Sequence, residues 1–177
     1  MTPGSRTVFI DVLFVLLMVL VLLPHNPETE SKHTPPGSVI VEIRWPDGLD
    51  TDVDLWVQAP GDDPVGYSRR AGEYFNLLRD DLGSARDALE LNYENAYSRG
   101  MPVGEYIVNL HLYASRSPLP VSVAVQVSRA TNTDTLLVFA RTVELVRIGQ
   151  QITVNRFTLN EHGVVQGSIN DLPKALR

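Results

Sequence analysis

A nearly uninterrupted apolar run near the N-terminus places the strongest constraint on how this chain can fold. Residues 8–23 read VFIDVLFVLLMVLVLL, in which Asp11 is the only charged residue. The stretch from Thr7 to Leu23 would form a helix of roughly 26 Å, at the short end of what crosses a bilayer. The sequence therefore predicts one transmembrane helix over residues 7–23.

The charges beside this run predict its orientation. Arg6 precedes it, whereas Glu28 and Glu30 follow it with Lys32 as the nearby base. The positive-inside rule then makes residues 1–6 a cytoplasmic tail and puts the remaining chain outside the cytoplasm. A cleaved signal peptide is disfavoured, because the run ends without a small-x-small cleavage site. We therefore expect a single-pass membrane protein.

Asp11 disfavours membrane insertion of such a helix, because a carboxylate at the centre of a span costs about 2.5–3.5 kcal/mol on insertion scales. One interpretation is a proton or ion site in a protected helix interface. The other is that Asp11, about one turn in from Thr7, reaches the cytoplasmic headgroups or pairs with Arg6. The residues alone leave both interpretations open.

The run Phe9-Ile10-Asp11-Val12-Leu13-Phe14-Val15-Leu16-Leu17-Met18 resembles the transmembrane helix of the ExbD/TolR proteins and, more loosely, of MotB. The resemblance implies the inner, homodimeric subunit of an ion-driven motor, within a ring of multi-span subunits like ExbB, TolQ or MotA. It also implies that Asp11 binds the proton or sodium ion, and that the protein lies in the bacterial inner membrane with its C-terminal domain in the periplasm. The match stops after Leu23, so no coupling to the outer envelope is implied.

The rest of the chain divides into a linker and a folded domain. Residues 24–37 (PHNPETESKHTPPG) hold four prolines and lack apolar periodicity, so they predict an extended linker in which His25 and His33 are solvated. From Ser38 the apolar residues alternate with a period of two. We expect residues 38–177 to form the extracytoplasmic domain.

Alternation predicts an all-β fold, an antiparallel β-sandwich of jelly-roll or Ig-like type, tethered to the membrane helix. Residues 74–93 are ambiguous, because Leu89, Leu91 and Tyr93 alternate as in a strand whereas Ala85–Leu91 could form a helical turn. We expect the residues after Ile169 to be a loosely packed end. The segments Thr51–Val57 and Gly104–Val108 resemble strands of uncharacterised bacterial extracytoplasmic β-sandwich domains, which implies no activity. The alternating runs are Val39–Trp45, Val53–Val57, Tyr106–Leu112, Val121–Val127, Leu136–Leu145 and Ile152–Leu159.

Acidic residues near the predicted turns suggest a calcium site, because calcium prefers carboxylate and carbonyl oxygens. Asp52 and Asp54 would lie on one strand face, and Asp80 or Asp81 could complete the site. The alternative is that these residues, with Asp62 and Asp63, simply face water at turns and strand ends. No EF-hand pattern is present.

Trp56 and Tyr67, with Arg69 and Arg70, suggest a ligand face for a glycan or a protein, since aromatic and arginine residues are enriched at binding surfaces. They could equally be core residues and charge-balancing arginines. No nucleophile elbow, zinc-protease helix or phosphate loop appears, and His111 on a predicted strand has an ordinary structural explanation, so we expect no enzyme.

Composition excludes two further classes of function. The net charge of −6 argues against a nucleic-acid partner, and the absence of cysteine excludes disulfides and thiolate metal sites. The sequence-based hypothesis is therefore an ion-binding motor subunit with a periplasmic β-sandwich. The alternative is a membrane-anchored periplasmic binding module, with a glycan or protein ligand and no ion transport.

Overall fold

The computed structural model describes residues 12–14, 16, 18, 38–82, 91–131 and 134–177. The chain divides into two compact units, Met1–His33 and Thr34–Arg177. In the first unit, residues 12–14, 16 and 18 are helical. Asp11, the predicted ion ligand, lies outside the described residues.

No helix within the described part of the chain combines the length and the apolar character needed to cross a membrane. This finding contradicts the predicted inner-membrane localisation. It also leaves the transmembrane tether of the predicted fold without support.

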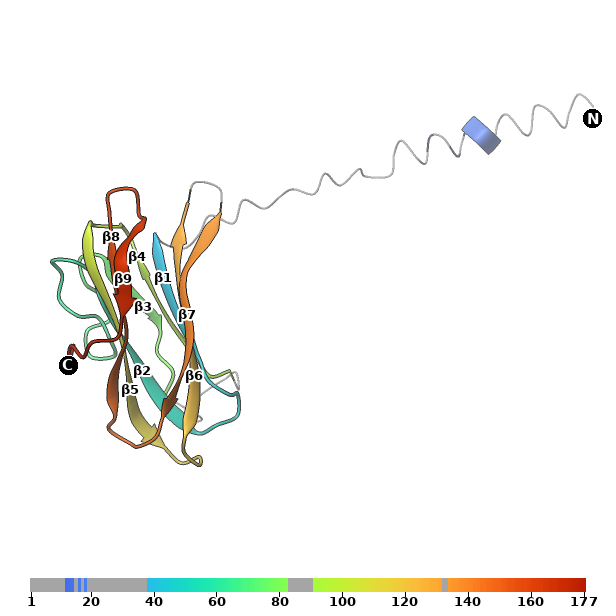
Figure 1. Ribbon diagram of the computed structural model, residues 1–177. Helices are drawn as coiled ribbons and strands as arrows, with labels where there is room; N and C mark the ends of the chain where they lie inside the picture. The colour runs from blue at the N-terminus through green and yellow to red at the C-terminus, as the bar shows by residue number, and fades with distance from the viewer. Residues whose placement is uncertain (1–11, 15, 17, 19–37, 83–90, 132–133) are drawn as a thin grey trace, which may run out of the picture. The chain divides into compact units, whose positions relative to one another are not determined.

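The second unit is all-β, and its described residues form nine strands (Figure 1). The strands are β1 (Val39–Arg44), β2 (Thr51–Gln58), β3 (Phe75–Arg79), β4 (Tyr93–Ser98), β5 (Gly104–Ser115), β6 (Val121–Ala130), β7 (Thr135–Leu145), β8 (Gln151–Leu159) and β9 (Val165–Asn170).

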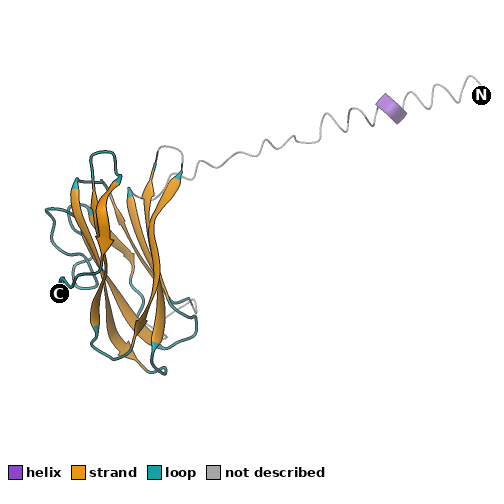
Figure 2. Cartoon of the chain, in the orientation of Figure 1, coloured by secondary structure: helices purple, strands orange, loops and turns teal. Residues whose placement is uncertain are grey.

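These strands form two antiparallel sheets that face each other as a sandwich (Figure 2). The first, sheet A, has the order β3-β4-β1-β6-β7, and the second, sheet B, has the order β2-β5-β8-β9. The predicted all-β antiparallel fold is therefore confirmed at the level of two sheets. The edge strand β2 of sheet B matters most for the site described below, because it carries Asp52 and Asp54.

The core follows from the alternation in the sequence, because successive side chains of a strand point to opposite faces. In β6, Val121, Val123, Val125 and Val127 are all buried, whereas Ala124 between them is exposed. The inward residues of both sheets join in one hydrophobic cluster that includes Trp45, Leu55, Leu110 and Phe157.

Two parts of the fold differ from the sequence-based expectation. Strands β3 and β4 occupy both ends of the region that the pattern left ambiguous, while the suggested helical turn at 85–91 lies almost wholly outside the described residues. The tail after Ile169 is not a loose end: β9 continues to Asn170, and Leu176 is buried. Leu176 is buried because it packs against Trp56 and Ile107 on the outer face of sheet B.

Candidate functional site

Five carboxylates gather where the edge of sheet B meets the edge of sheet A. Asp52 and Asp54 come from β2, Asp80 and Asp81 follow β3, and Glu94 lies in β4. We call this group the acidic edge. The five groups interact electrostatically. The like charges of Asp54, Asp80 and Asp81 raise the pKa of Asp52, and those of Asp80 and Asp54 raise the pKa of Glu94. The structure thus brings the predicted calcium residues together and adds Glu94 to them.

Glu94 links the two sheets at this edge. Its side chain is fully buried, at 0% exposure, and accepts a 2.8 Å hydrogen bond from the Leu55 backbone N–H of β2. Its other oxygen accepts a 3.0 Å bond from the Asp81 backbone N–H. Burial raises the pKa of Glu94 well above its ordinary value, although these two hydrogen bonds act in the opposite direction. Glu94 therefore satisfies two backbone donors, one in β2 and one in the segment after β3.

Asp52 is a strongly perturbed carboxylate of the acidic edge. Burial, reinforced by the charges of its acidic neighbours, raises its pKa to about 7 from the ordinary 3.8. Burial also raises the pKa of Asp54, while the hydrogen bond and the charge of His111 lower it. Near neutral pH the acidic edge is therefore short of positive charge, and it favours a proton or a cation.

Two oxygens of the acidic edge lack the partners that buried polar atoms normally have. Asp52 Oδ1 and Asp80 Oδ1 are both buried, and neither has a hydrogen-bond partner among the described residues. By contrast, Asp81 Oδ2 lies 3.3 Å from Arg79 Nη2 and accepts a 3.1 Å bond from the Tyr93 N–H. The buried carboxylate oxygens of this edge that lack hydrogen-bond partners therefore belong to Asp52 and Asp80.

The acidic edge does not form a finished metal cage. As the side chains stand, no three His, Cys, Asp or Glu residues of the described segments are arranged to hold a metal ion. A pocket of about 280 Å³ opens beside Asp52, with Asp50, Ser115 and Arg116 in its wall. An incoming cation would therefore have to draw the carboxylates inward.

The other acidic pair predicted from the sequence lies elsewhere. Asp62 accepts a 3.0 Å hydrogen bond from the Tyr74 N–H, and Asp63 forms a 2.9 Å ion pair with Arg69. These contacts stabilise the loop between β2 and β3.

The structure brings together half of the predicted ligand face. Trp56 and Tyr67 make an edge-to-face contact with their ring centroids 5.6 Å apart, and Tyr113 lies 6.2 Å from Tyr67. Arg69 is instead held by Asp63, and Arg70 is exposed on the same loop. A Cβ at Gly66 would lie 2.4 Å from the Trp56 ring, so glycine is required for the loop to approach this closely.

His111 connects the aromatic residues to the acidic edge. Its Nδ1 lies 2.8 Å from Asp54 Oδ2, and its ring lies 6.1 Å from that of Tyr113. The guanidinium group of Arg177 lies 3.0 Å from the same nitrogen and 5.5 Å from the centre of the Tyr67 ring. This arrangement could not be predicted from the sequence, because its members come from four distant segments: β2, the loop after it, β5 and the C-terminal residues.

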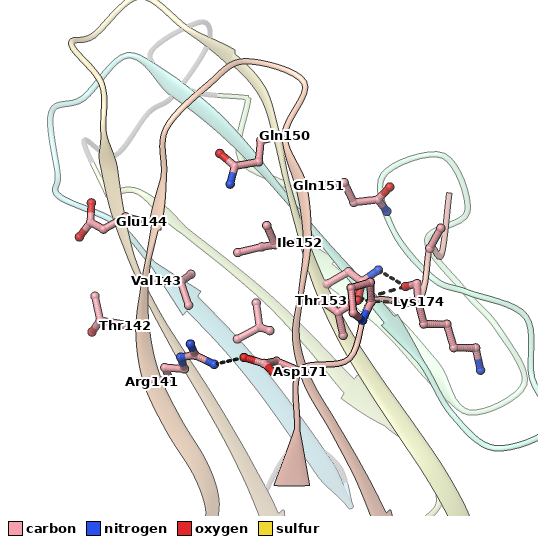
Figure 3. Close-up of a pocket in the computed structure, with 14 residues that line it drawn as sticks. Arg141, Thr142, Val143, Glu144, Gln150, Gln151, Ile152, Thr153, Asp171 and Lys174 are labelled. Carbon is pink, nitrogen blue, oxygen red and sulfur yellow. Dashed lines mark hydrogen bonds and ion pairs between the residues drawn. The ribbon is translucent and has the colours of Figure 1, made fainter.

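A larger pocket of about 580 Å³ lies among β7, the first half of β8 and the tail of the chain, residues 171–177 (Figure 3). An ion pair of 2.9 Å between Arg141 and Asp171 crosses it from β7 to the tail. Its wall also includes Glu144, Gln151 and Lys174. The lining mixes both charges with amides and lacks a group of perturbed carboxylates, so it is a weaker candidate site than the acidic edge.

Comparison with known proteins finds no matching family model and no matching curated protein. Two solved structures match. One is a homologue of the telluride resistance protein TerD from Streptomyces coelicolor A3(2), with 16% identity and a TM-score of 0.47, covering 78% of this chain and 92% of that chain. The other is a protein of unknown function, with 14% identity and a TM-score of 0.47, covering 77% and 91%. Likeness at this level carries no argument about function.

These findings contradict the assignment to ion-driven motors that the resemblance implied. The structures that match are a TerD homologue and a protein of unknown function, and none is an ExbD, TolR or MotB subunit. The short apolar pattern around Asp11 was misleading because few residues of low complexity carried it. The motor function, the ring of ExbB-like partners with its homodimer, and the link to the proton motive force are therefore wrong.

Proposed function

We propose that this chain is a calcium-binding β-sandwich module without catalytic activity, in which the acidic edge holds the ion. The observation that supports it most directly is the pair of buried oxygens, Asp52 Oδ1 and Asp80 Oδ1, that lack a hydrogen-bond partner in the described structure. They lie in a cluster whose negative charge is only partly compensated.

Calcium suits this cluster better than other common cations. It takes six to eight oxygen ligands at 2.3–2.6 Å in a flexible geometry, whereas magnesium demands a near-ideal octahedron and zinc prefers histidine and thiolate. The acidic edge offers carboxylate oxygens from three strands or strand ends, without a preformed geometry. A cation that tolerates irregular coordination is therefore the best match.

A bound calcium ion would also remove a cost that the ion-free fold carries. Asp52 resists ionisation because it is buried and because Asp54, Asp80 and Asp81 are nearby. A divalent cation reverses this effect, since it favours the charged form of each ligand. Calcium binding would then stabilise the fold and release protons from the acidic edge.

Thermal unfolding of the full chain, followed by circular dichroism, tests this proposal. At a calcium concentration one hundred times the dissociation constant, linkage predicts a stabilisation of about 2.7 kcal/mol. We expect the melting temperature to rise in millimolar calcium relative to chelator. Magnesium at the same concentration should raise it much less.

Two variants make the test specific. Asp52→Asn should abolish most of the calcium response, because it removes an ion ligand. Asp63→Asn is the matched control, since Asp63 is exposed and paired with Arg69 away from the acidic edge. If calcium leaves the melting temperature of the parent unchanged, or if both variants respond as the parent does, the acidic edge is not a calcium site.

A further inference from the structure

The last seven residues of the chain lie across the outer face of sheet B. We call residues 171–177 the tail. The face beneath it consists of side chains that alternate with the core residues of β2, β5 and β8, together with Tyr67. These tail-binding residues are Trp56, Tyr67, Ile107, Asn109, His111 and Thr153.

The face binds the tail first through its main chain. Asn109 Nδ2 donates a 2.7 Å hydrogen bond to the carbonyl oxygen of Lys174, and Thr153 Oγ1 donates one of 3.2 Å to the same oxygen. The Lys174 backbone N–H in turn donates a 2.9 Å bond to Thr153 Oγ1 (Figure 3). Since both backbone groups of residue 174 are bound, this contact would accept an extended peptide whatever side chain stands there.

Two adjacent contacts select particular side chains. Leu176 is 7% exposed and packs against Trp56 and Ile107, while the other tail residues are exposed. Arg177 places its guanidinium group 5.5 Å from the centre of the Tyr67 ring and beside His111. Asp54 lies behind His111 and supplies negative charge. The face therefore fits an apolar residue followed by arginine, at the second and third positions after the residue whose backbone it binds.

The tail leaves part of this face unused. Trp56 Nε1 and Asn109 Oδ1 are buried and have no hydrogen-bond partner among the described residues. Both atoms belong to side chains that contact the tail directly. A ligand that supplied an acceptor to the indole N–H and a donor to the amide oxygen would fit the face better than the tail does.

We propose that the outer face of sheet B is a peptide-binding site, and that the tail occupies it as an internal competitor. The ligand is an extended segment of a partner protein in which an apolar residue is followed by arginine. The tail then acts as a low-affinity template, which the partner segment displaces. The peptide site can be tested apart from the calcium function, because its test is carried out in chelator.

The test adds a labelled peptide with the sequence of residues 171–177 to two full-length proteins and measures fluorescence anisotropy. In the release variant, Leu176→Asp and Arg177→Asp weaken the internal tail. We expect the release variant to bind the peptide at least tenfold more tightly than the parent. A control peptide with Asp at the position of Leu176 should bind neither protein.

Further arms keep the test decisive. Arg177→Ala alters an exposed residue, so it should preserve the fold even where the release variant does not, and it should bind the peptide more tightly than the parent. Adding Thr153→Val to either variant should reduce binding, because it removes both hydrogen bonds between Thr153 and the backbone of residue 174. The proposal is overturned if neither variant binds the peptide better than the parent. It is also overturned if the parent forms concentration-dependent dimers that Arg177→Ala abolishes, because the occupant is then a second copy of the tail.

Discussion

Asn155 should destabilise the fold that it helps to form. It lies in β8 opposite Val108, a core residue, and its side chain is 0% exposed. Neither its Nδ2 nor its Oδ1 atom has a hydrogen-bond partner among the described residues. A buried amide without partners costs about 1–3 kcal/mol on the evidence of mutational data.

Asn155→Leu removes both unpaired atoms and keeps a side chain of similar length. Leu shares the branched skeleton of Asn but is larger, and overpacking of a core costs about 1–3 kcal/mol. Burial of the new methyl groups, at about 0.8 kcal/mol each, offsets much of this cost. We therefore expect a net increase of about 1–2 kcal/mol in the free energy of unfolding, which raises the melting temperature by roughly 2–4 °C per kcal/mol.

Urea unfolding, followed through the fluorescence of the buried Trp45 and Trp56, measures this change. The denaturation midpoint should rise while the slope with denaturant stays constant. Asn155→Asp is the matched control, and it should be strongly destabilising because it buries an unpaired charge. A stability loss above about 1 kcal/mol in Asn155→Leu would refute the reasoning, because it would mean that the amide is satisfied by a buried water molecule.

Two further predictions concern the acidic edge. The pKa of Asp52 is raised to about 7, so in chelator its contribution to stability is fully present below about pH 4 and is lost as pH rises through 7. Asp52→Asn should make the melting temperature depend less on pH over this range. Glu94→Gln should lower the free energy of unfolding by about 1–3 kcal/mol in urea titrations, because the amide offers one acceptor for two backbone donors; equal stability would show that these bonds contribute nothing.

The strands with clean alternation could be predicted from the sequence because burial of one face leaves a period of two. Val121 to Val127 is the clearest case, and β6 contains it. Strand β4 was harder, because its inward positions include Glu94 and Ser98 rather than large apolar residues. Once β4 is known to be a strand, a glutamate at an inward position is itself the signal for a polar site.

The candidate site was only partly predictable. The close spacing of Asp52 and Asp54 was visible, but the approach of Asp80, Asp81 and Glu94 depends on how two sheet edges meet. The tail was misjudged because Leu176 is a single apolar residue among polar and small ones, and no periodicity identifies one anchor. Its burial follows from the apolar side chains of Trp56 and Ile107, which sheet B presents to it.

The position of Asp54 makes the two proposed sites interdependent. Its carboxylate belongs to the acidic edge, and it also holds His111 beneath Arg177, whose charge lowers the pKa of Asp54. A calcium ion and the Arg177 guanidinium group would therefore compete for the same negative charge. Because coupling between two binding equilibria is reciprocal, calcium must weaken docking of the tail by the same factor as the docked tail weakens calcium binding. A module built this way would expose its peptide site when calcium rises, with a single aspartate as the coupling element.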